Sequence, residues 1–198
     1  MLLESLSPHP SPSPKLEQYT ITGDDAAKFL WRIRDWLRGR VVIDLGCGVG
    51  RLTIGAALLG ACLSVGVDVD PIALKVARDN ARRMGVCHAT SWIRAHIPEL
   101  SIKGDVVIQN PPFGVQHRGA DRAFIECALR TAPTSFSLHK KSPKSRNFIK
   151  KFVEEFGGEA EVIDTLKLKV PRLFNFHKEK FRLVETDLFI FKRKGSLY

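Results

Sequence analysis

The sequence predicts an α/β fold, a doubly wound and mostly parallel sheet of seven strands with helices on both faces. Short apolar runs rich in β-branched residues alternate with segments of helical periodicity along the chain. A glycine-rich turn follows the first apolar run, and several runs end in an acidic or amide residue. Such residues gather where a ligand lies beyond the carboxyl ends of parallel strands. At 198 residues, the chain is long enough for one domain with a full core.

The expected helices and strands follow one another in a regular order. Apolar and charged residues at helical spacing predict a first helix at 24–37, with Trp31 facing inward. Asp70 followed by Pro71 is typical of an N-cap and a first helical turn. In chain order, the other expected elements are strand 41–45, helix 51–59, strand 63–68, helix 71–84, a weak strand at 87–92, strand 104–109, helix 119–131, strand 134–138, a basic helix at 144–156, and strands 159–169 and 182–192.

The corner Asn110-Pro111-Pro112-Phe113 follows the strand at 104–109. Two consecutive prolines exclude a helix and remove two backbone donors, so the chain is expected to leave the strand as a stiff, exposed corner. An amide oxygen and a carbonyl there can both accept from one exocyclic amino group, while a phenyl ring stacks on the heterocycle. The alternative is an ordinary proline turn, with Asn110 as a turn former and Phe113 in the core.

A second motif, Asp44-Leu45-Gly46-Cys47-Gly48-Val49-Gly50, lies between the strand at 41–45 and the helix at 51–59. Glycines in such a turn permit positive φ and let the backbone approach a ligand closely. The spacing is not Gly-x-Gly-x-x-Gly, and the absence of a Gly-Lys-Ser/Thr sequence excludes a P-loop. Asp68 ends the next strand about 20 residues further on, where a carboxylate meets ribose hydroxyls in nucleoside-binding βαβ units.

The glycine turn, the acidic strand end and the corner together resemble the class I S-adenosylmethionine-dependent methyltransferases that act on amino groups. Further matches make the chain similar to archaeal-type members of the methyltransferase-like protein 5 family, which methylates the 6-amino group of an adenine in small-subunit ribosomal RNA. The resemblance runs from about Leu16 to the C-terminus. The matching segments are 16–19, 52–56, 59–61, 65–70, 110–114, 121–124, 137–140 and 174–178.

The resemblance implies a Rossmann-like class I methyltransferase fold whose last two strands form a hairpin-like pair, antiparallel at the edge of the sheet. It also implies a single methyltransferase domain at 16–198. The Ser/Pro-rich composition of residues 1–15 predicts a disordered or extended segment before this domain.

S-adenosylmethionine is the cofactor that the resemblance implies. Asp68 is expected to take both ribose hydroxyls and Val69 to flank the adenine ring. Trp92 replaces an acidic residue of the family pattern, and it either stacks on the adenine or packs in the core. The whole set assigned to the cofactor is Gln18, Tyr19, Asp44, Gly46, Cys47, Gly48, Gly50, Asp68 and Val69.

The corner is expected to hold the target amine. Asn110 Oδ1 and the Pro111 carbonyl would accept the two amine protons, with Phe113 stacked on the base. The catalytic set is therefore Asn110, Pro111, Pro112 and Phe113. The candidates for substrate contact are Phe113, His139, Lys140, Phe176, His177 and Lys178.

Several of these candidates have equally weighted alternatives. His139 and Lys140 either bind phosphate or are solvated. Phe176 and His177 either contact the base or RNA, or anchor a loop and cap a carbonyl. The other histidines, at positions 9, 88 and 96, are assigned no role.

The charge distribution favours a polyanionic partner. The formal net charge is +10, and residues 130–198 contain 16 Lys/Arg against 8 Asp/Glu, a difference of +8. Such an excess attracts RNA with an affinity that falls as salt rises, although a solvated basic surface would look the same. The resemblance adds a small zinc-containing activator protein as a further partner, because eukaryotic relatives work with one.

The four cysteines occur singly, which suggests neither a metal site nor a disulfide framework and favours a reduced, cytoplasmic setting. Cys47 fits the glycine turn, and the cysteines at 62, 87 and 127 are expected in the core. No signal peptide or membrane span is expected.

Two other functions stay open beside RNA adenine methylation. A guanine amine or a protein glutamine amide is an alternative acceptor, although Phe113 and the basic C-terminal third argue against glutamine. A non-catalytic RNA-binding or ribosome-assembly module is the other alternative. The intact glycines, Asp68 and Asn110 argue against that one.

Overall fold

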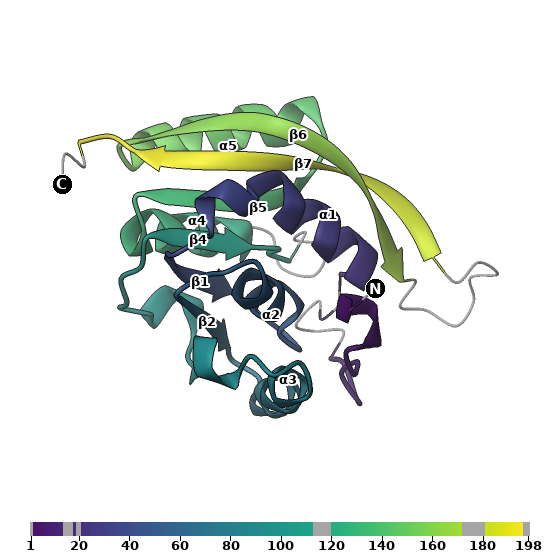
Figure 1. Ribbon diagram of the computed structural model, residues 1–198. Helices are drawn as coiled ribbons and strands as arrows, with labels where there is room; N and C mark the ends of the chain where they lie inside the picture. The colour runs from purple at the N-terminus through teal and green to yellow at the C-terminus, as the bar shows by residue number, and fades with distance from the viewer. Residues whose placement is uncertain (1, 14–17, 19–20, 113–119, 172–180, 196–198) are drawn as a thin grey trace.

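The structure is a computed structural model that describes residues 2–13, 18, 21–112, 120–171 and 181–195. Over these residues it contains one sheet of seven strands in the order β3-β2-β1-β4-β5-β7-β6 (Figure 1). The strands are β1 Val41–Leu45, β2 Leu63–Asp68, β3 Thr90–Arg94, β4 Val106–Gln109, β5 Thr134–Lys140, β6 Gly158–Pro171 and β7 Phe181–Arg193.

The pairing confirms the predicted doubly wound, mostly parallel sheet. Strands β1 to β5 pair in parallel, whereas β7 is antiparallel to both β5 and β6. The antiparallel strand therefore lies one position inside the edge, and β6 forms the edge itself.

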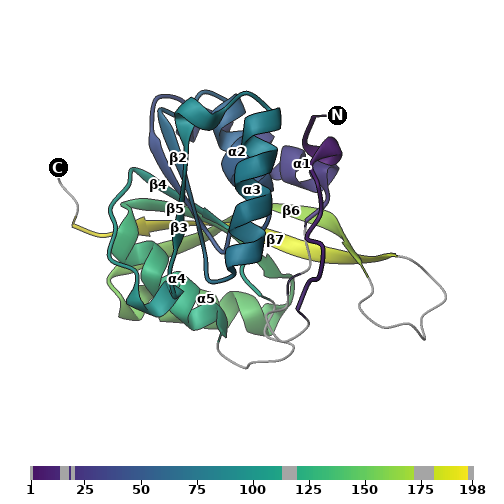
Figure 2. The ribbon, with the colours of Figure 1, turned by 90° about the horizontal axis from the view of Figure 1, so that it is seen from below.

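Helices cover both faces of the sheet. Figure 2 shows α1, α2 and α3 on one side and α4 and α5 on the other. These helices are α1 Gly23–Ile33, α2 Arg51–Leu58, α3 Pro71–Arg83, α4 Ala120–Thr131 and α5 Pro143–Glu155. Short 3-10 turns occur at Leu2–Ser5, Arg34–Trp36, Cys87–Ala89 and Ile97–Glu99. None of the helices in the described ranges is long and apolar enough to cross a membrane.

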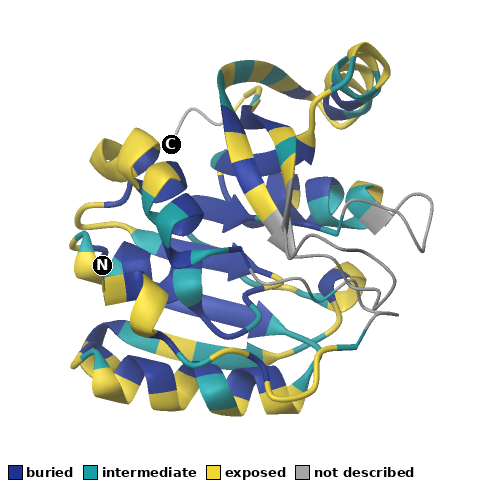
Figure 3. Cartoon of the chain, turned by 90° about the vertical axis from the view of Figure 1, so that its right-hand side faces the viewer, coloured by how far each residue is buried: buried dark blue, intermediate teal, exposed yellow. Residues whose placement is uncertain are grey.

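The core is divided between the two faces. Val42 of β1 belongs to the cluster beneath α1 and α2, whereas Ile43 and Leu45 belong to the cluster beneath α4. Because successive strand residues point to opposite faces, both sides of this strand are buried, and its sequence is apolar except for Asp44. Figure 3 shows the same pattern, with buried strands between helices whose outer sides are exposed.

The edge strand β6 is covered by α1. Lys169 N of β6 donates to Asp25 Oδ2 at 2.8 Å, and Arg32 Nε lies 2.6 Å from Asp164 Oδ2. An unpaired strand edge is a template for aggregation, and covering it with a helix removes that hazard.

The prediction that Trp31 faces inward is wrong, because its side chain is 60% exposed. The buried stripe of α1 consists of Ala26, Phe29, Leu30 and Ile33, and Trp31 lies off that stripe. The guanidinium of Arg34 stacks over its ring at 4.5 Å instead. The cysteines at 62 and 87 are also exposed against expectation, whereas those at 47 and 127 are buried.

The N-terminal segment contacts the rest of the domain over residues 2–13. Leu3 and Leu6 are buried in the same cluster as Phe29 of α1. Ser7 N donates to Asn80 Oδ1 at 2.9 Å, and Asn80 Nδ2 donates back to Ser7 O at 3.1 Å. Two leucines ahead of the proline-rich run supply an apolar anchor that the Ser/Pro composition does not reveal.

Replacing Leu6 by alanine is expected to lower the free energy of unfolding by about 2 kcal/mol, the low end for a buried leucine because a terminal segment can relax. Chemical denaturation measures this change. Leu2→Ala is the matched control, because Leu2 is 64% exposed while Leu6 is 2% exposed. Equal denaturation midpoints for the two variants would show that the segment does not pack on the domain.

Candidate active site

The three strand-end residues singled out in the sequence lie on adjacent strands. β1 pairs with β2 on one side and with β4 on the other. Asp44 lies near the end of β1, Asp68 ends β2, and Asn110 directly follows β4. The predicted convergence at the carboxyl edge of the sheet is therefore confirmed.

The glycine turn wraps closely over the end of β2. Gly46, Gly48 and Gly50 have φ values of 72°, 53° and 86°. The backbone N–H groups of Gly46 and Cys47 both donate to Val67 O at 2.9 Å. Residues with a Cβ rarely adopt this left-handed conformation, which explains glycine at all three positions.

Two of these glycines meet different surroundings. A Cβ on Gly50 would lie 2.6 Å from the ring of Trp92, so this position has no room for a side chain. A Cβ on Gly48 would meet no atom of the described residues within 4 Å. The turn therefore presents bare backbone beside Asp68.

The carboxylate of Asp68 is held by the backbone on both oxygens. Oδ2 accepts from Gly48 N at 2.8 Å, and Oδ1 accepts from Asp70 N at 2.9 Å. Burial raises the pKa of Asp68, and these two N–H groups act against that rise. Each oxygen retains a further lone pair, so the pair of oxygens can accept from a diol.

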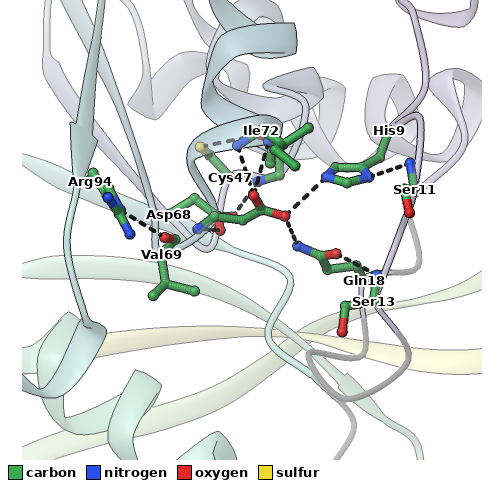
Figure 4. A network of polar contacts seen from close by, with 12 residues as sticks. His9, Ser11, Ser13, Gln18, Cys47, Asp68, Val69, Ile72 and Arg94 are labelled. Atoms are coloured by element: carbon green, nitrogen blue, oxygen red, sulfur yellow. Dashed lines mark hydrogen bonds and ion pairs between the residues drawn. The ribbon is translucent and has the colours of Figure 1, made fainter.

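Asp70 joins the N-terminal segment to this site. Figure 4 shows His9 and Gln18 of that segment in one network of polar contacts with Asp68. The Oδ1 atom of Asp70 caps α3 by accepting from Ile72 N at 2.8 Å, which confirms the predicted N-cap. Its Oδ2 accepts from Gln18 Nε2 at 2.7 Å and lies 3.0 Å from His9 Nε2. The contact of Gln18 with the cofactor remains a prediction, but its bond to Asp70, which is two residues from Asp68 in sequence, suits that role.

His9 is a site residue that the sequence did not reveal. Ser11 N donates to His9 Nδ1 at 3.0 Å, which leaves Nε2 as the donor to Asp70. The contact joins residues 61 positions apart, and a lone histidine in a Ser/Pro-rich segment carries no signal for it.

Asp44 is buried and binds the first turn of α2. Its Oδ2 accepts from Thr53 N at 3.0 Å and from the Thr53 hydroxyl at 2.6 Å. Burial raises the pKa of Asp44 to about 7. Its Oδ1 is buried and has no hydrogen-bond partner within the described part of the chain. Asp44 thus braces the glycine turn, and its direct contact with the cofactor remains a prediction.

Trp92 packs behind the glycine turn. A Cβ on Gly66 of β2 would lie 2.6 Å from its ring, as would one on Gly50. The ring also packs against the buried cluster beneath α1 and α2. These contacts support core packing, the second of the two alternatives for Trp92.

At the corner, Asn110 Oδ1 is buried and accepts from no donor in the described ranges. Pro111 is buried and Pro112 is partly exposed. The predictions for Tyr19, Phe113, Phe176, His177 and Lys178 fall outside the described residues.

The structure contradicts both alternatives for His139, because its side chain is only 4% exposed and can neither reach an RNA phosphate nor be solvated. Its ring lies edge-on to Phe189 of β7. Burial lowers the pKa of His139 to about 3, so the imidazole is neutral. Lys140 is exposed, as expected.

Comparison with known proteins agrees with this geometry. A family profile described as ribosomal protein L11 methyltransferase (PrmA) matches residues 31–111. The chain is 34% identical to the Drosophila melanogaster rRNA N(6)-adenosine-methyltransferase Mettl5, over 96% of this chain and 92% of that protein. It is also 38% identical to an uncharacterised protein of Methanocaldococcus jannaschii, over 97% of this chain and 90% of the relative.

Solved structures show the same fold. A Pyrococcus horikoshii protein described as a candidate RNA methyltransferase superposes with a TM-score of 0.89, at 34% identity, over 96% of this chain and 94% of that one. The magnesium protoporphyrin IX methyltransferase of Synechocystis, solved with bound S-adenosylmethionine, gives a TM-score of 0.62 at 21% identity, over 86% and 77% of the two chains. With near-complete coverage by a curated relative above 30% identity, the chain belongs to the methyltransferase-like protein 5 family of class I S-adenosylmethionine-dependent methyltransferases.

Proposed function

We propose that this protein methylates the 6-amino group of an adenine in ribosomal RNA, in the small subunit, with S-adenosylmethionine as the methyl donor. The buried Asn110 Oδ1 at the carboxyl edge of the sheet carries the proposal, because no described residue donates to it. The Drosophila relative, named as an rRNA N(6)-adenosine-methyltransferase, supports this acceptor.

The residues present fit the cofactor. The bare backbone at Gly48 and the remaining lone pairs of Asp68 would hold its ribose against the glycine turn. When bound, the cofactor supplies an electrophilic methyl carbon, which the amine nitrogen attacks as the carbon–sulfur bond breaks and sulfur keeps the electron pair.

Asn110 would orient the amine for this transfer. The lone pair of an adenine amino group is delocalised into its ring, and an acceptor for an N–H proton favours a pyramidal nitrogen whose lone pair points at the methyl carbon. Holding both reactants in this way can replace roughly 7–11 kcal/mol of orientation cost in favourable cases. After transfer, the extra proton of the nitrogen leaves to water.

The basic C-terminal third would hold the RNA. Exposed lysines project from the end of β5 and from α5, and they are Lys140, Lys141, Lys144, Lys150 and Lys151. Phosphate contacts by such side chains give affinity without reading the sequence. A zinc-containing activator protein and a cytoplasmic location complete the proposal, and both come from the sequence and its family resemblance.

The substrate assignment is tested by mass-spectrometric nucleoside analysis of ribosomal RNA from cells with and without the gene. We expect N6-methyladenosine to disappear from one position of the small-subunit RNA in the deletion strain. Loss of a methylguanosine, or of a methylated glutamine in a protein digest, would instead identify the alternative acceptors.

Asp68→Asn is expected to weaken cofactor binding by roughly 10- to 100-fold, because it removes the charge that strengthens hydrogen bonds from the ribose hydroxyls. Isothermal titration with S-adenosylhomocysteine measures the dissociation constant. Asp79→Asn on α3 is the matched control, because that carboxylate lies on the surface beside Arg82. A dissociation constant equal to that of the wild type would remove Asp68 from the cofactor site.

Asn110→Ala is expected to lower kcat by at least about 100-fold, the loss typical of a preorganised polar group at the reacting centre. Cofactor affinity should stay unchanged, since Asn110 acts on the amine. The control is Asn147→Ala, which alters an exposed asparagine of α5. A native kcat in Asn110→Ala, measured with saturating RNA, contradicts the role assigned to the amide.

A further inference from the structure

Three buried polar side chains form a hydrogen-bonded chain directly behind the Asn110 corner. Gln109 Nε2 at the end of β4 donates to Ser137 Oγ of β5 at 2.9 Å. Ser137 Oγ lies 2.7 Å from His139 Nε2, two residues further along β5. All three side chains are buried. Burying polar groups costs free energy even when they are paired, so a hydrogen-bonded chain of three buried side chains requires an explanation.

The place of Gln109 in the sheet suggests the explanation. The parallel register of β4 ends at Gln109, which pairs with Leu45 on one side and with Ser137 on the other. Gln109 is therefore the last residue of β4 that both neighbouring strands hold, and Asn110 follows it immediately. The side-chain bond to Ser137 adds a further anchor at the point where the backbone ladder stops.

A contribution to stability alone does not explain why Gln109, Ser137 and His139 are buried together. Gln109 Oε1 is buried and has no hydrogen-bond partner in the described part of the molecule. A buried acceptor without a partner is destabilising, and an apolar side chain of similar size would avoid that cost.

One arrangement of the protons lets the Ser137 hydroxyl both accept and donate within this hydrogen-bonded chain. The hydroxyl of Ser137 accepts from Gln109 and has a single proton of its own, which it can donate to His139 Nε2. His139 then carries its proton on Nδ1. The neutral state of the imidazole agrees with this acceptor role.

The carboxylate opposite His139 is engaged elsewhere. Asp187 pairs with His139 across the β5–β7 ladder, but its oxygens accept from Arg146 Nε and Nη2, each at 2.7 Å, and from the Thr165 hydroxyl at 2.8 Å. A carboxylate committed to an arginine in this way raises the pKa of His139 less than burial lowers it, so the imidazole stays a weak base. The geometry therefore argues against His139 as a general base.

We propose that Gln109, Ser137 and His139 are positioning residues for methyl transfer. Their chain clamps the end of β4 to β5, and this clamp fixes the backbone from which Asn110 presents its amide oxygen to the target amine. The inference rests on the proposed function, because it assumes that Asn110 orients the amine.

The test compares two serines of the same strand. Ser137→Ala removes the centre of the chain, and we expect kcat to fall about tenfold or more, since small misplacements of a reacting group are costly. The dissociation constant for S-adenosylhomocysteine should stay close to the wild-type value. The thermal midpoint should fall by a few degrees, because Gln109 Nε2 loses its acceptor, and the fall in kcat is therefore measured well below that midpoint. Ser135→Ala is the matched control, because Ser135 is buried on the same face and has only a 3.4 Å contact with Ala128 O. Its kcat should remain native.

Two variants at position 139 separate positioning from other roles. His139→Gln retains an acceptor for the Ser137 hydroxyl and should keep most of the kcat, whereas His139→Leu should lose as much as Ser137→Ala. The pH profile of kcat between pH 6 and 9 should keep its shape in both variants. If His139→Gln removed a limb of that profile, His139 would be an acid–base group and the inference would fail.

The outcomes also distinguish this inference from the proposed function. Equal kcat values for Ser137→Ala and Ser135→Ala, with the wild type active on ribosomal RNA adenine, would overturn the positioning role alone. A wild-type protein that transfers no methyl group to that adenine would overturn the proposed function, and the inference with it.

Discussion

The close approach of the glycine turn to the end of β2 is the constraint from which the rest of the site follows. Two N–H groups of the turn share the carbonyl of Val67, and a third binds Asp68. This approach requires glycines with positive φ, a tryptophan ring that fills the space behind them, and a buried Asp44 that ties β1 to α2. Loosening any of these contacts would move the carboxylate of Asp68 relative to the bare backbone beside it. The arrangement of the glycine turn and Asp68 thus follows from how the neighbouring strands β1 and β2 end.

The N-terminal segment extends this arrangement. Asp70 caps α3 with one oxygen and binds His9 and Gln18 with the other, so the N-terminal segment is held beside Asp68. The leucines at positions 3 and 6 hold the same segment on the outer side of α1 and α2. Asp70 is thus an ordinary N-cap of a helix beginning with Asp-Pro, and it also positions His9 and Gln18 beside the site.

The opposite wall depends on the end of β4. The backbone ladder stops at Gln109, and the buried chain through Ser137 to His139 continues the anchoring in side chains. Asn110 begins the corner immediately after this anchor, with its amide oxygen enclosed. Rigid support on the strand side and a stiff proline corner on the other suit the role proposed for Asn110, which is to hold the target amine in one orientation.

The sequence by itself determined the order of the helices and strands, most of their bounds to within about two residues, the glycine turn, the strand-end acids and the Asn-Pro-Pro corner. The expected end of α1 at 37 and start of β3 at 87 were wrong, because Arg34–Trp36 and Cys87–Ala89 form 3-10 turns. The features predicted correctly depend on residues close together in the chain, and local periodicity, proline and glycine report them directly. Tertiary structure alone decided that Trp31 lies outside, that His139 is buried between β5 and β7, and that His9 binds Asp70. Tertiary structure also decided that the antiparallel strand β7 lies one position inside the edge of the sheet, between β5 and β6. Each of these depends on partners that lie far apart in the chain or on which face an element buries, and a single sequence does not encode such contacts in any local pattern.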